Sequence, residues 1–396
     1  MAKTLIIDHL SGSRIPFLRG IMTRSLQDSG MEFEQAYEVA SLIREKLGEK
    51  KEISSLTLRE MVVKHLEKTG LPEILEQYSD LSIPPDLITV VEHDGSTSAF
   101  SESDTRRHLE ACGLSSTESG AVINSLSDSF LKKGETRLSV DQLGYRIYQL
   151  LKKEFGNSHA QNYLVWRNFM ESGRPLLLLI GGTTGCGKST VATEVAHILD
   201  IVRTQSTDML REVMRIMIPK RLLPVLHQSS FTAWQALPRA STNEGNDSET
   251  NLMAGYFSQS ELLSVSTEAV VNRALHERVS LILEGIHIHP ALLEKIPRDT
   301  DAAVVMVMLG VLKQGQLKKQ IRGRGALIPK RRAKRYLKYF DDIWRIQSNL
   351  LAEADNCQVP IVINDNKERV LREIMRIVVS TLKKDFDSTP EKVFNL

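Results

Sequence analysis

Continuous apolar runs in the second half of the chain predict the strands of a buried sheet. Strands that are apolar on both faces are typical of a parallel sheet covered by helices on both sides. The stretch 190–199, after the first run, has the spacing of an amphipathic helix. The pattern predicts an α/β domain, with strands at 176–180, 201–205, 279–283, 302–309 and 360–363.

The first half of the chain repeats itself with an offset of about 83 positions. Each copy opens with a β-like stretch and a turn, and Asp94-Gly95 in the second copy is a strong hairpin signal. A helix should follow in each copy and end at a glycine, which readily adopts the left-handed conformation found after helices. The matched positions are Leu5, Phe17, Leu26 and Gly30 in the first copy and Ile88, Phe100, Leu109 and Gly113 in the second.

Further helices in both copies are predicted from apolar spacing and from helix-start signals. One face of a helix in the first copy is shared by Phe33, Ala36, Ala40, Ile43 and Leu47. Capping boxes, in which Ser or Thr is followed three residues later by Glu or Gln, occur at 57–60, 115–118 and 139–142. We therefore expect two small, mainly helical modules.

Short motifs in the first copy resemble the ATP-cone, a regulatory nucleotide-binding domain. These motifs are Arg14-Ile-Pro-Phe17, Arg24-Ser-Leu26 and Ala36-Tyr-Glu-Val-Ala40. The second copy keeps Phe100, Arg106 and Leu109 but lacks the proline and the Ala-Tyr segment. The resemblance implies a regulatory nucleotide at these modules. A helical scaffold or dimerisation module that binds nothing, and with it a homo-oligomer, stays open.

The domain boundaries follow from these patterns. We expect one ATP-cone-like module at 1–70, a second, diverged one at 86–156, and the α/β domain at 157–396. Pro72 and Pro84-Pro85 indicate a linker between the modules. A polar stretch without periodicity, 241–251, is expected to be a loop of the α/β domain.

A glycine-rich loop joins the first apolar strand to the amphipathic helix. Strand, loop and helix in this order are the context that a phosphate-binding P-loop needs. Backbone N–H groups and the helix N-terminus would surround the phosphates of ATP, Lys188 would neutralise them, and the Ser189 hydroxyl would hold Mg²⁺. The expected nucleotide-binding residues are Gly182, Thr183, Thr184, Gly185, Cys186, Gly187, Lys188, Ser189 and Thr190.

Acidic and basic side chains follow the next two strands. Asp208 comes after the strand at 201–205, where it would orient the acceptor hydroxyl or a Mg²⁺-bound water, and it is a candidate metal ligand with Ser189; the same residue could instead cap a helix. Arg211 and Arg215 lie one helical turn apart beyond it and suit an anionic substrate. Glu284 ends the strand at 279–283, where it would support the metal.

Two further segments are candidates for the acceptor pocket. His287 is expected to contact an anionic substrate, because His287 and His289 lack the further ligands of a metal site. The segment 227–234 carries hydroxyls, an imidazole and two aromatic rings. Its candidate substrate-binding residues are His227, Ser229 and Ser230.

The densest positive charge in the chain follows the strand at 302–309. No acidic residue occurs from 313 to 340, and small-molecule kinases often carry such a segment as a lid that folds over the phosphates. Arg322 and Arg324 are the expected catalytic lid arginines. A nucleic-acid-binding patch is the rival interpretation, but aromatic residues interleave only weakly with the charges.

Composition excludes several classes of protein. The net charge is +2 over 396 residues, which argues against an overall attraction to nucleic acid or membranes. Three distant cysteines suit a reducing compartment without disulfides. An N-terminal signal and a membrane-spanning apolar run are not expected, so we expect a cytoplasmic protein.

The motifs of the α/β domain, taken in order, resemble 2-phosphoglycerate kinase. They are the loop at 181–189, Ser206 to Arg215, 227–234, Glu284-Gly-Ile-His287 and the stretch 335–347. The resemblance covers about 160–370 and implies transfer of the ATP γ-phosphate to 2-phosphoglycerate, giving 2,3-bisphosphoglycerate. A kinase of another anionic metabolite, such as an inositol phosphate, and a non-catalytic ATP-sensing protein stay open.

Overall fold

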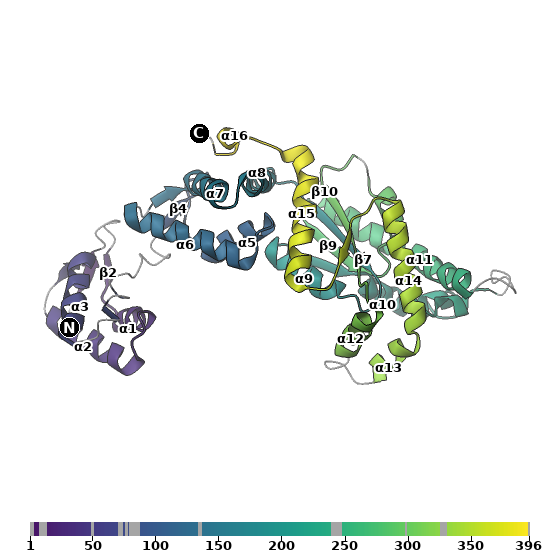
Figure 1. Ribbon diagram of the computed structural model, residues 1–396, viewed down its shortest axis with the longest axis horizontal. Helices are drawn as coiled ribbons and strands as arrows, with labels where there is room; N and C mark the ends of the chain where they lie inside the picture. The colour runs from purple at the N-terminus through teal and green to yellow at the C-terminus, as the bar shows by residue number, and fades with distance from the viewer. Residues whose placement is uncertain are drawn as a thin grey trace. The chain divides into compact units, whose positions relative to one another are not determined.

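The structure is a computed structural model, which describes most of the chain (Figure 1). The described residues are 4–7, 14–48, 51–69, 74–75, 78, 88–133, 137–238, 248–297, 299–324 and 331–394. The chain divides into two compact units, 1–102 with 123–146 and 103–122 with 147–396. These units divide the second module between them, so the boundaries 1–70, 86–156 and 157–396 stay a prediction. Most of the predicted linker, 70–86, lies outside the described residues.

The second unit is built around a five-stranded sheet in which every strand pair is parallel. The strand order is β11-β10-β7-β9-β8, so β7 lies at the centre and all of its residues are buried. The bounds are β7 Leu176–Gly182, β8 Arg203–Ser206, β9 Leu281–Gly285, β10 Ala303–Gly310 and β11 Ile361–Ile363. The predicted parallel α/β sheet is therefore confirmed.

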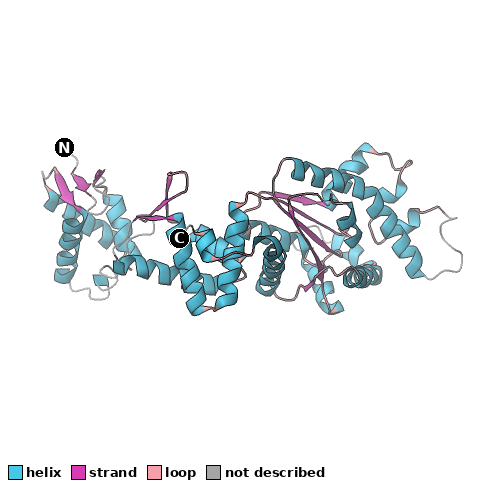
Figure 2. Ribbon diagram, turned by 90° about the horizontal axis from the view of Figure 1, so that it is seen from above, coloured by secondary structure: helices cyan, strands magenta, loops and turns pink. Residues whose placement is uncertain are grey.

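Helices pack on both faces of this sheet (Figure 2). α9 and α15 pack against each other, as do α11 and α14. Because α11 begins at Ser248, the last four residues of the stretch expected as a loop are helical, while 241–247 lie outside the described residues. The helices are α8 Asn157–Glu171, α9 Lys188–Ile198, α10 Thr207–Met217, α11 Ser248–His276, α12 Gln314–Arg324, α13 Arg331–Lys338, α14 Phe340–Asn356, α15 Lys367–Phe386 and α16 Pro390–Val393.

The two modules contain three-stranded sheets of the same topology. In each, the first strand pairs antiparallel with the second and parallel with the third. The strands are β1 Leu5–Ile7, β2 Arg14–Pro16 and β3 Glu52–Ser54 in the first module, and β4 Thr89–Val91, β5 Thr97–Ala99 and β6 Arg137–Ser139 in the second. The helices are α1 Arg19–Asp28, α2 Phe33–Leu47, α3 Ser55–Thr69, α5 Glu102–Ala111, α6 Ser116–Lys133 and α7 Val140–Glu154. Internal repetition thus extends from sequence to topology.

The helix starts follow the predicted caps in two of three cases. Ser115 and Glu118 exchange both capping-box hydrogen bonds, and Ser139 and Gln142 do the same. The box predicted at 57–60 is wrong. The Ser54 hydroxyl accepts from the Thr57 backbone N–H at 3.1 Å, and α3 begins at Ser55, one turn earlier. The last residue of β3 therefore caps the next helix, as the last residue of β6 does.

The core of the first module lies along the predicted face of α2. Ala36, Ala40 and Ile43 are fully buried. Phe33, which was expected on the same face, is exposed and stacks on Tyr37. Among the described residues, no helix has the length and apolar character needed to cross a membrane.

Candidate active site

The loop between β7 and α9 has the backbone of a phosphate-binding loop. Gly182, Gly185 and Gly187 have backbone φ angles of 139°, 89° and 94°, which residues other than glycine rarely adopt. A Cβ atom at Gly187 would lie 2.3 Å from Asn364 Nδ2, so the loop is also closely packed. Lys188 is buried, and its Nζ donates to the Thr183 carbonyl at 2.8 Å. The loop thus holds its lysine at the N-terminus of α9.

A hydroxyl and a carboxylate meet beside this loop. Ser189, in the first turn of α9, donates to Glu284 Oε1 at 2.9 Å, and Glu284 is buried at the end of β9. The two residues meet because β9 is paired with β7, which leads into the loop. Hydroxyl and carboxylate oxygens are ligands that Mg²⁺ prefers, so this pair fits a magnesium ion.

Asp208 occupies the second position of α10. The N-cap is Ser206, whose hydroxyl accepts the Asp208 N–H, so Asp208 is not the cap. Its carboxylate is exposed and lies 3.5 Å from Arg211 Nη2. Asp208 was also predicted as a metal ligand, whereas the oxygen pair seen in the structure is Ser189 with Glu284.

Arg211, which lies next to Asp208, has a largely buried and hydrogen-bonded guanidinium group. Its side chain is 15% exposed, and Nη1 donates to the Gln228 carbonyl at 3.4 Å. Its Nε is buried and has no hydrogen-bond partner among the described residues. A buried donor without a partner is costly, and an anion would satisfy it. Arg215 is similar. Its Nη1 forms an ion pair with Glu212 at 2.6 Å, and its buried Nε has no hydrogen-bond partner within the described residues.

The candidate acceptor segment connects α10 to the basic helix α13. The Ser229 hydroxyl accepts from Arg335 Nη2 at 3.2 Å. The buried ring of Phe231 contacts the rings of Tyr336 and Tyr339, with centroids 5.7 and 5.4 Å apart. Arg335 therefore lies beside the candidate acceptor segment, and the sequence placed it in the basic stretch and in the 335–347 motif without singling it out.

The other residues predicted in these two segments have varied surroundings. His227 Nε2 donates to the Ile218 carbonyl at 2.8 Å, and Ser230 is buried. Arg322 is exposed on α12. The side chain of Arg324 lies outside the described part of the structure. The structure thus places His227 in a local backbone contact and Arg322 at the surface.

His287 belongs to a buried hydrogen-bond network. Gln259 Nε2 donates to the carbonyls of Val225 and Gln228, at 2.7 and 3.1 Å, so its Oε1 faces His287 Nε2 at 3.0 Å. The imidazole therefore donates from Nε2 and accepts at Nδ1 from the Thr207 hydroxyl. Burial, assisted by Arg211, lowers the pKa of His287 to about 3.

This network changes the interpretation of His287. Both ring nitrogens are engaged with protein groups, and the ring is neutral near pH 7. In this arrangement neither nitrogen faces a substrate anion, contrary to the contact that we expected. The residue instead connects the start of α10 to α11. Gln259, which completes the network, carried no signal in the sequence.

Asn364, after β11, supports the glycine-rich loop from the side. Its Nδ2 donates to the Cys186 carbonyl at 2.8 Å, and its own carbonyl accepts from Gln316 Nε2 at 2.9 Å. Cys186 is a free, buried thiol that packs within the loop. Asn364 thus positions the loop, a role that was not predicted from the sequence.

Known proteins are similar in sequence to most of this chain. No protein-family model matches. A 2-phosphoglycerate kinase from Pyrococcus furiosus is 33% identical over 303 residues, which cover 75% of this chain and 97% of that protein. One from Methanopyrus kandleri is 32% identical over 286 residues, covering 72% of this chain and 85% of that protein.

Solved structures share less with the chain. A gluconokinase from Sinorhizobium meliloti is 14% identical, with a TM-score of 0.26, and covers 54% of this chain and 94% of its own. A shikimate kinase from Bacteroides thetaiotaomicron is 18% identical with a TM-score of 0.26, covering 53% and 96%. Such scores carry no argument, and the assignment rests on the sequence relatives. A parallel sheet, a phosphate-binding loop and this identity together show that the chain belongs to the 2-phosphoglycerate kinase family, as a P-loop kinase that transfers phosphate to an alcohol group.

Proposed function

We propose that the chain transfers the γ-phosphate of ATP to the 3-hydroxyl of 2-phosphoglycerate. The observation that carries this proposal is Arg211, a largely buried guanidinium with an unpartnered Nε beside an exposed carboxylate. An acceptor with a phosphate and a carboxylate needs such a cation next to the group that handles its hydroxyl. The named function of the family's relatives supports the same acceptor.

The nucleotide side of the reaction is assigned to the loop between β7 and α9. Backbone N–H groups of the loop and Lys188 bind the phosphates of ATP. Ser189 and Glu284 hold Mg²⁺, which supplies charge neutralisation at the phosphates when bound. Glu284 orients the Ser189 hydroxyl by accepting a hydrogen bond from it.

Asp208 acts on the acceptor. Its exposed carboxylate orients the substrate hydroxyl and accepts the proton as the hydroxyl oxygen attacks. Arg211 and Arg215 bind the anionic groups of the acceptor. Arg335, held near Ser229, and Arg322 on the exposed face of α12 complete the positive surface over the transferred phosphate. For Arg324 this role stays a prediction.

The test measures ADP release from ATP and Mg²⁺ with 2-phosphoglycerate, 3-phosphoglycerate, glycerate, an inositol phosphate or no acceptor. We expect strong stimulation by 2-phosphoglycerate alone, with 2,3-bisphosphoglycerate identified by phosphorus NMR. Stimulation by another acceptor keeps the mechanism and rejects the substrate. Tight ATP binding without acceptor-dependent turnover favours an ATP-sensing protein.

A further inference from the structure

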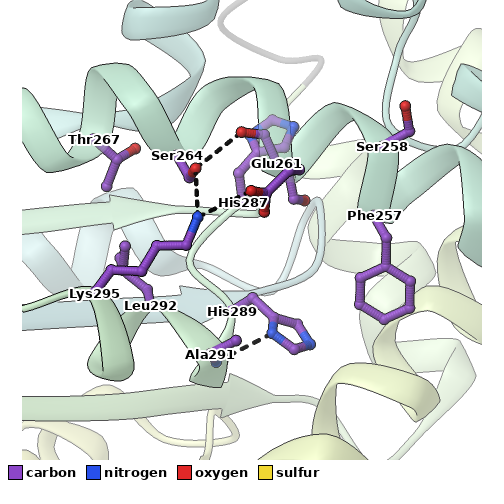
Figure 3. Close-up of a pocket in the computed structure, with 11 residues that line it drawn as sticks. Phe257, Ser258, Glu261, Ser264, Thr267, His287, His289, Ala291, Leu292 and Lys295 are labelled. Atoms are coloured by element: carbon purple, nitrogen blue, oxygen red, sulfur yellow. Dashed lines mark hydrogen bonds and ion pairs between the residues drawn. The ribbon is translucent and has the colours of Figure 1, made fainter.

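A second pocket lies away from the phosphate-binding loop. It has a volume of about 400 Å³ and lies between α11, the segment after β9 and the 3₁₀ helix η5, Pro290–Lys295 (Figure 3). Its lining includes Phe257, Ser264, His289, Ala291 and Lys295. Neither the glycine-rich loop nor Asp208 nor Glu284 contributes to the described lining, and the pocket meets the candidate active site at His287.

The charges around this pocket disfavour an anion. Lys295 Nζ lies 2.8 Å from Ser264 Oγ, 3.1 Å from Glu261 Oε1 and 3.3 Å from Glu268 Oε1. An ammonium group has three protons, and here three acceptors surround it. Lys295 is therefore engaged by Ser264 and by two carboxylates, of which Glu261 lines the pocket, and it is not available to a bound anion.

Neutral hydrogen-bonding groups occupy the rest of the lining. Ser260, Ser264 and Thr267 all line the pocket from α11, where spacings of four and seven residues place side chains on one face. The Ser264 hydroxyl donates to the Glu261 carbonyl and accepts from Lys295, whereas the Ser260 hydroxyl has no partner among the described residues and can both donate and accept. Phe257 and Leu292 add apolar surface. Hydroxyls beside apolar carbon are the complement of a polyhydroxylated molecule.

His289 adds a buried donor. Its Nδ1 accepts the backbone N–H of Ala291 at 3.2 Å, so the neutral ring carries its proton on Nε2. That atom is buried and, within the described residues, has no hydrogen-bond partner. Figure 3 shows the ring between Ala291 and Phe257, whose ring centroid is 5.2 Å away. A ligand oxygen would satisfy this donor.

We propose that this pocket binds a compact, uncharged polyol as a regulatory ligand. The volume suits a molecule of about six carbon atoms. His287 also lines the pocket and is bonded to Thr207, next to Asp208, while Glu284 lies three residues earlier in the same segment. A bound polyol would therefore contact His287, in the segment that also carries Glu284.

Binding is tested on the full chain by ligand-observed NMR with three probes: D-glucitol, myo-inositol and D-gluconate. Gluconate matches glucitol except for one carboxylate. We expect the two uncharged polyols to bind with Kd values of about 1 mM, and gluconate at least about tenfold more weakly. Binding must persist when 2-phosphoglycerate and ADP saturate the kinase site, which separates this proposal from the proposed function.

Two variants locate the binding. Ala291→Phe fills the pocket and is expected to weaken glucitol binding at least about tenfold, whereas Val265→Phe, at an exposed position of α11, leaves it unchanged. His289→Asn keeps an acceptor for the Ala291 N–H but removes the Nε2 donor, and should weaken binding about tenfold. The proposal is overturned if neither polyol binds at about 20 mM, if gluconate binds as well as glucitol, or if both pocket variants bind like the wild type.

Discussion

Two residues near the start of α10, Asp208 and Arg211, carry opposite charges and differ in how exposed their side chains are. The Asp208 carboxylate is accessible, while the Arg211 guanidinium is mostly buried and only partly hydrogen-bonded. The carboxylate can therefore meet a substrate hydroxyl, and the guanidinium can bind a substrate anion without leaving its place. Sequence spacing predicted both residues, because i, i+3 and i+7 positions of a helix share a face. It did not predict which of them is buried.

Asp208→Asn should lower kcat about 10²- to 10⁴-fold, because the amide does not accept the proton of the acceptor hydroxyl. ATP affinity should stay unchanged. Steady-state kinetics and nucleotide titration measure the two effects. A near-normal kcat for Asp208→Asn would reject the assigned role.

Arg211→Gln should raise KM for 2-phosphoglycerate at least about 30-fold, since a buried charge-assisted contact to an anion is worth about 2 kcal/mol or more. KM for ATP should change little. Arg273→Gln, an exposed arginine paired with Glu277, is the control. Equal increases in both KM values would indicate general disruption of the site.

Acidification should destabilise the second unit through its buried histidines. Burial lowers the pKa of His287 to about 3, and burial followed by Arg167 lowers that of His108 to about 4. Below the unfolded value of about 6.5, only the unfolded chain takes up these protons, so stability falls with pH until the folded values are reached. Each histidine should contribute about 2 kcal/mol of loss between pH 6.5 and 5.

Denaturant unfolding at pH 7 and pH 5 measures this loss. His287→Gln and His108→Gln each remove one such histidine, and each variant should therefore lose less stability on acidification than the wild type. An unchanged pH dependence in both variants would place the acid sensitivity elsewhere, for example in paired carboxylates. His276, on the surface of α11, provides the control substitution His276→Gln.

At the scale of elements, strand ends serve as helix caps and loop supports. Ser54, Ser139 and Ser206 each end a strand and cap or bond the first turn of the following helix. The residues after β11 behave similarly, since Asn364 holds the P-loop and Asn366 caps α15. Local signals predicted the caps at Ser115 and Ser139, but they suggested Asp208 where Ser206 is the cap. They also misplaced the start of α3. The Thr57–Glu60 segment matches a capping box, but the residue that caps the helix is Ser54, about one turn earlier.

Asn364→Ala should raise KM for ATP about tenfold, because the Cys186 carbonyl loses its donor and the loop loses its support. KM for the acceptor should not change. Asn366→Ala is a matched control two residues away: it removes the N-cap of α15 and should lower stability by about 1 kcal/mol without changing KM for ATP. Equal effects of both variants on KM would count against a specific role for Asn364.

At the scale of the whole molecule, one chain joins a kinase to two related modules. The shared sheet topology indicates a duplicated module, and the loss of the proline and of the Ala-Tyr segment in the second copy indicates that the copies have diverged. Nucleotide binding by either module stays a prediction. The first module keeps Arg14, in β2, with an ion pair to Glu52 at 3.5 Å.

Lys188→Ala should weaken ATP binding at the P-loop while leaving any binding at the modules intact. Titration of this full-length variant with ATP is expected to show a residual binding event. The event should weaken when Arg14→Gln is added. A variant without residual binding would identify the modules as a scaffold or an oligomerisation element.

The sequence by itself determined the parallel α/β fold, the duplicated modules and the phosphate-binding loop. These depend on local apolar patterns and on residues adjacent in the chain, whose conformations follow from short-range sterics and burial. Only the tertiary structure decided that Glu284 meets Ser189, that His287 is enclosed by Thr207 and Gln259, and that Arg335 reaches Ser229. These contacts join residues 28 to 106 positions apart, so they exist only after strand order and helix packing have brought them together.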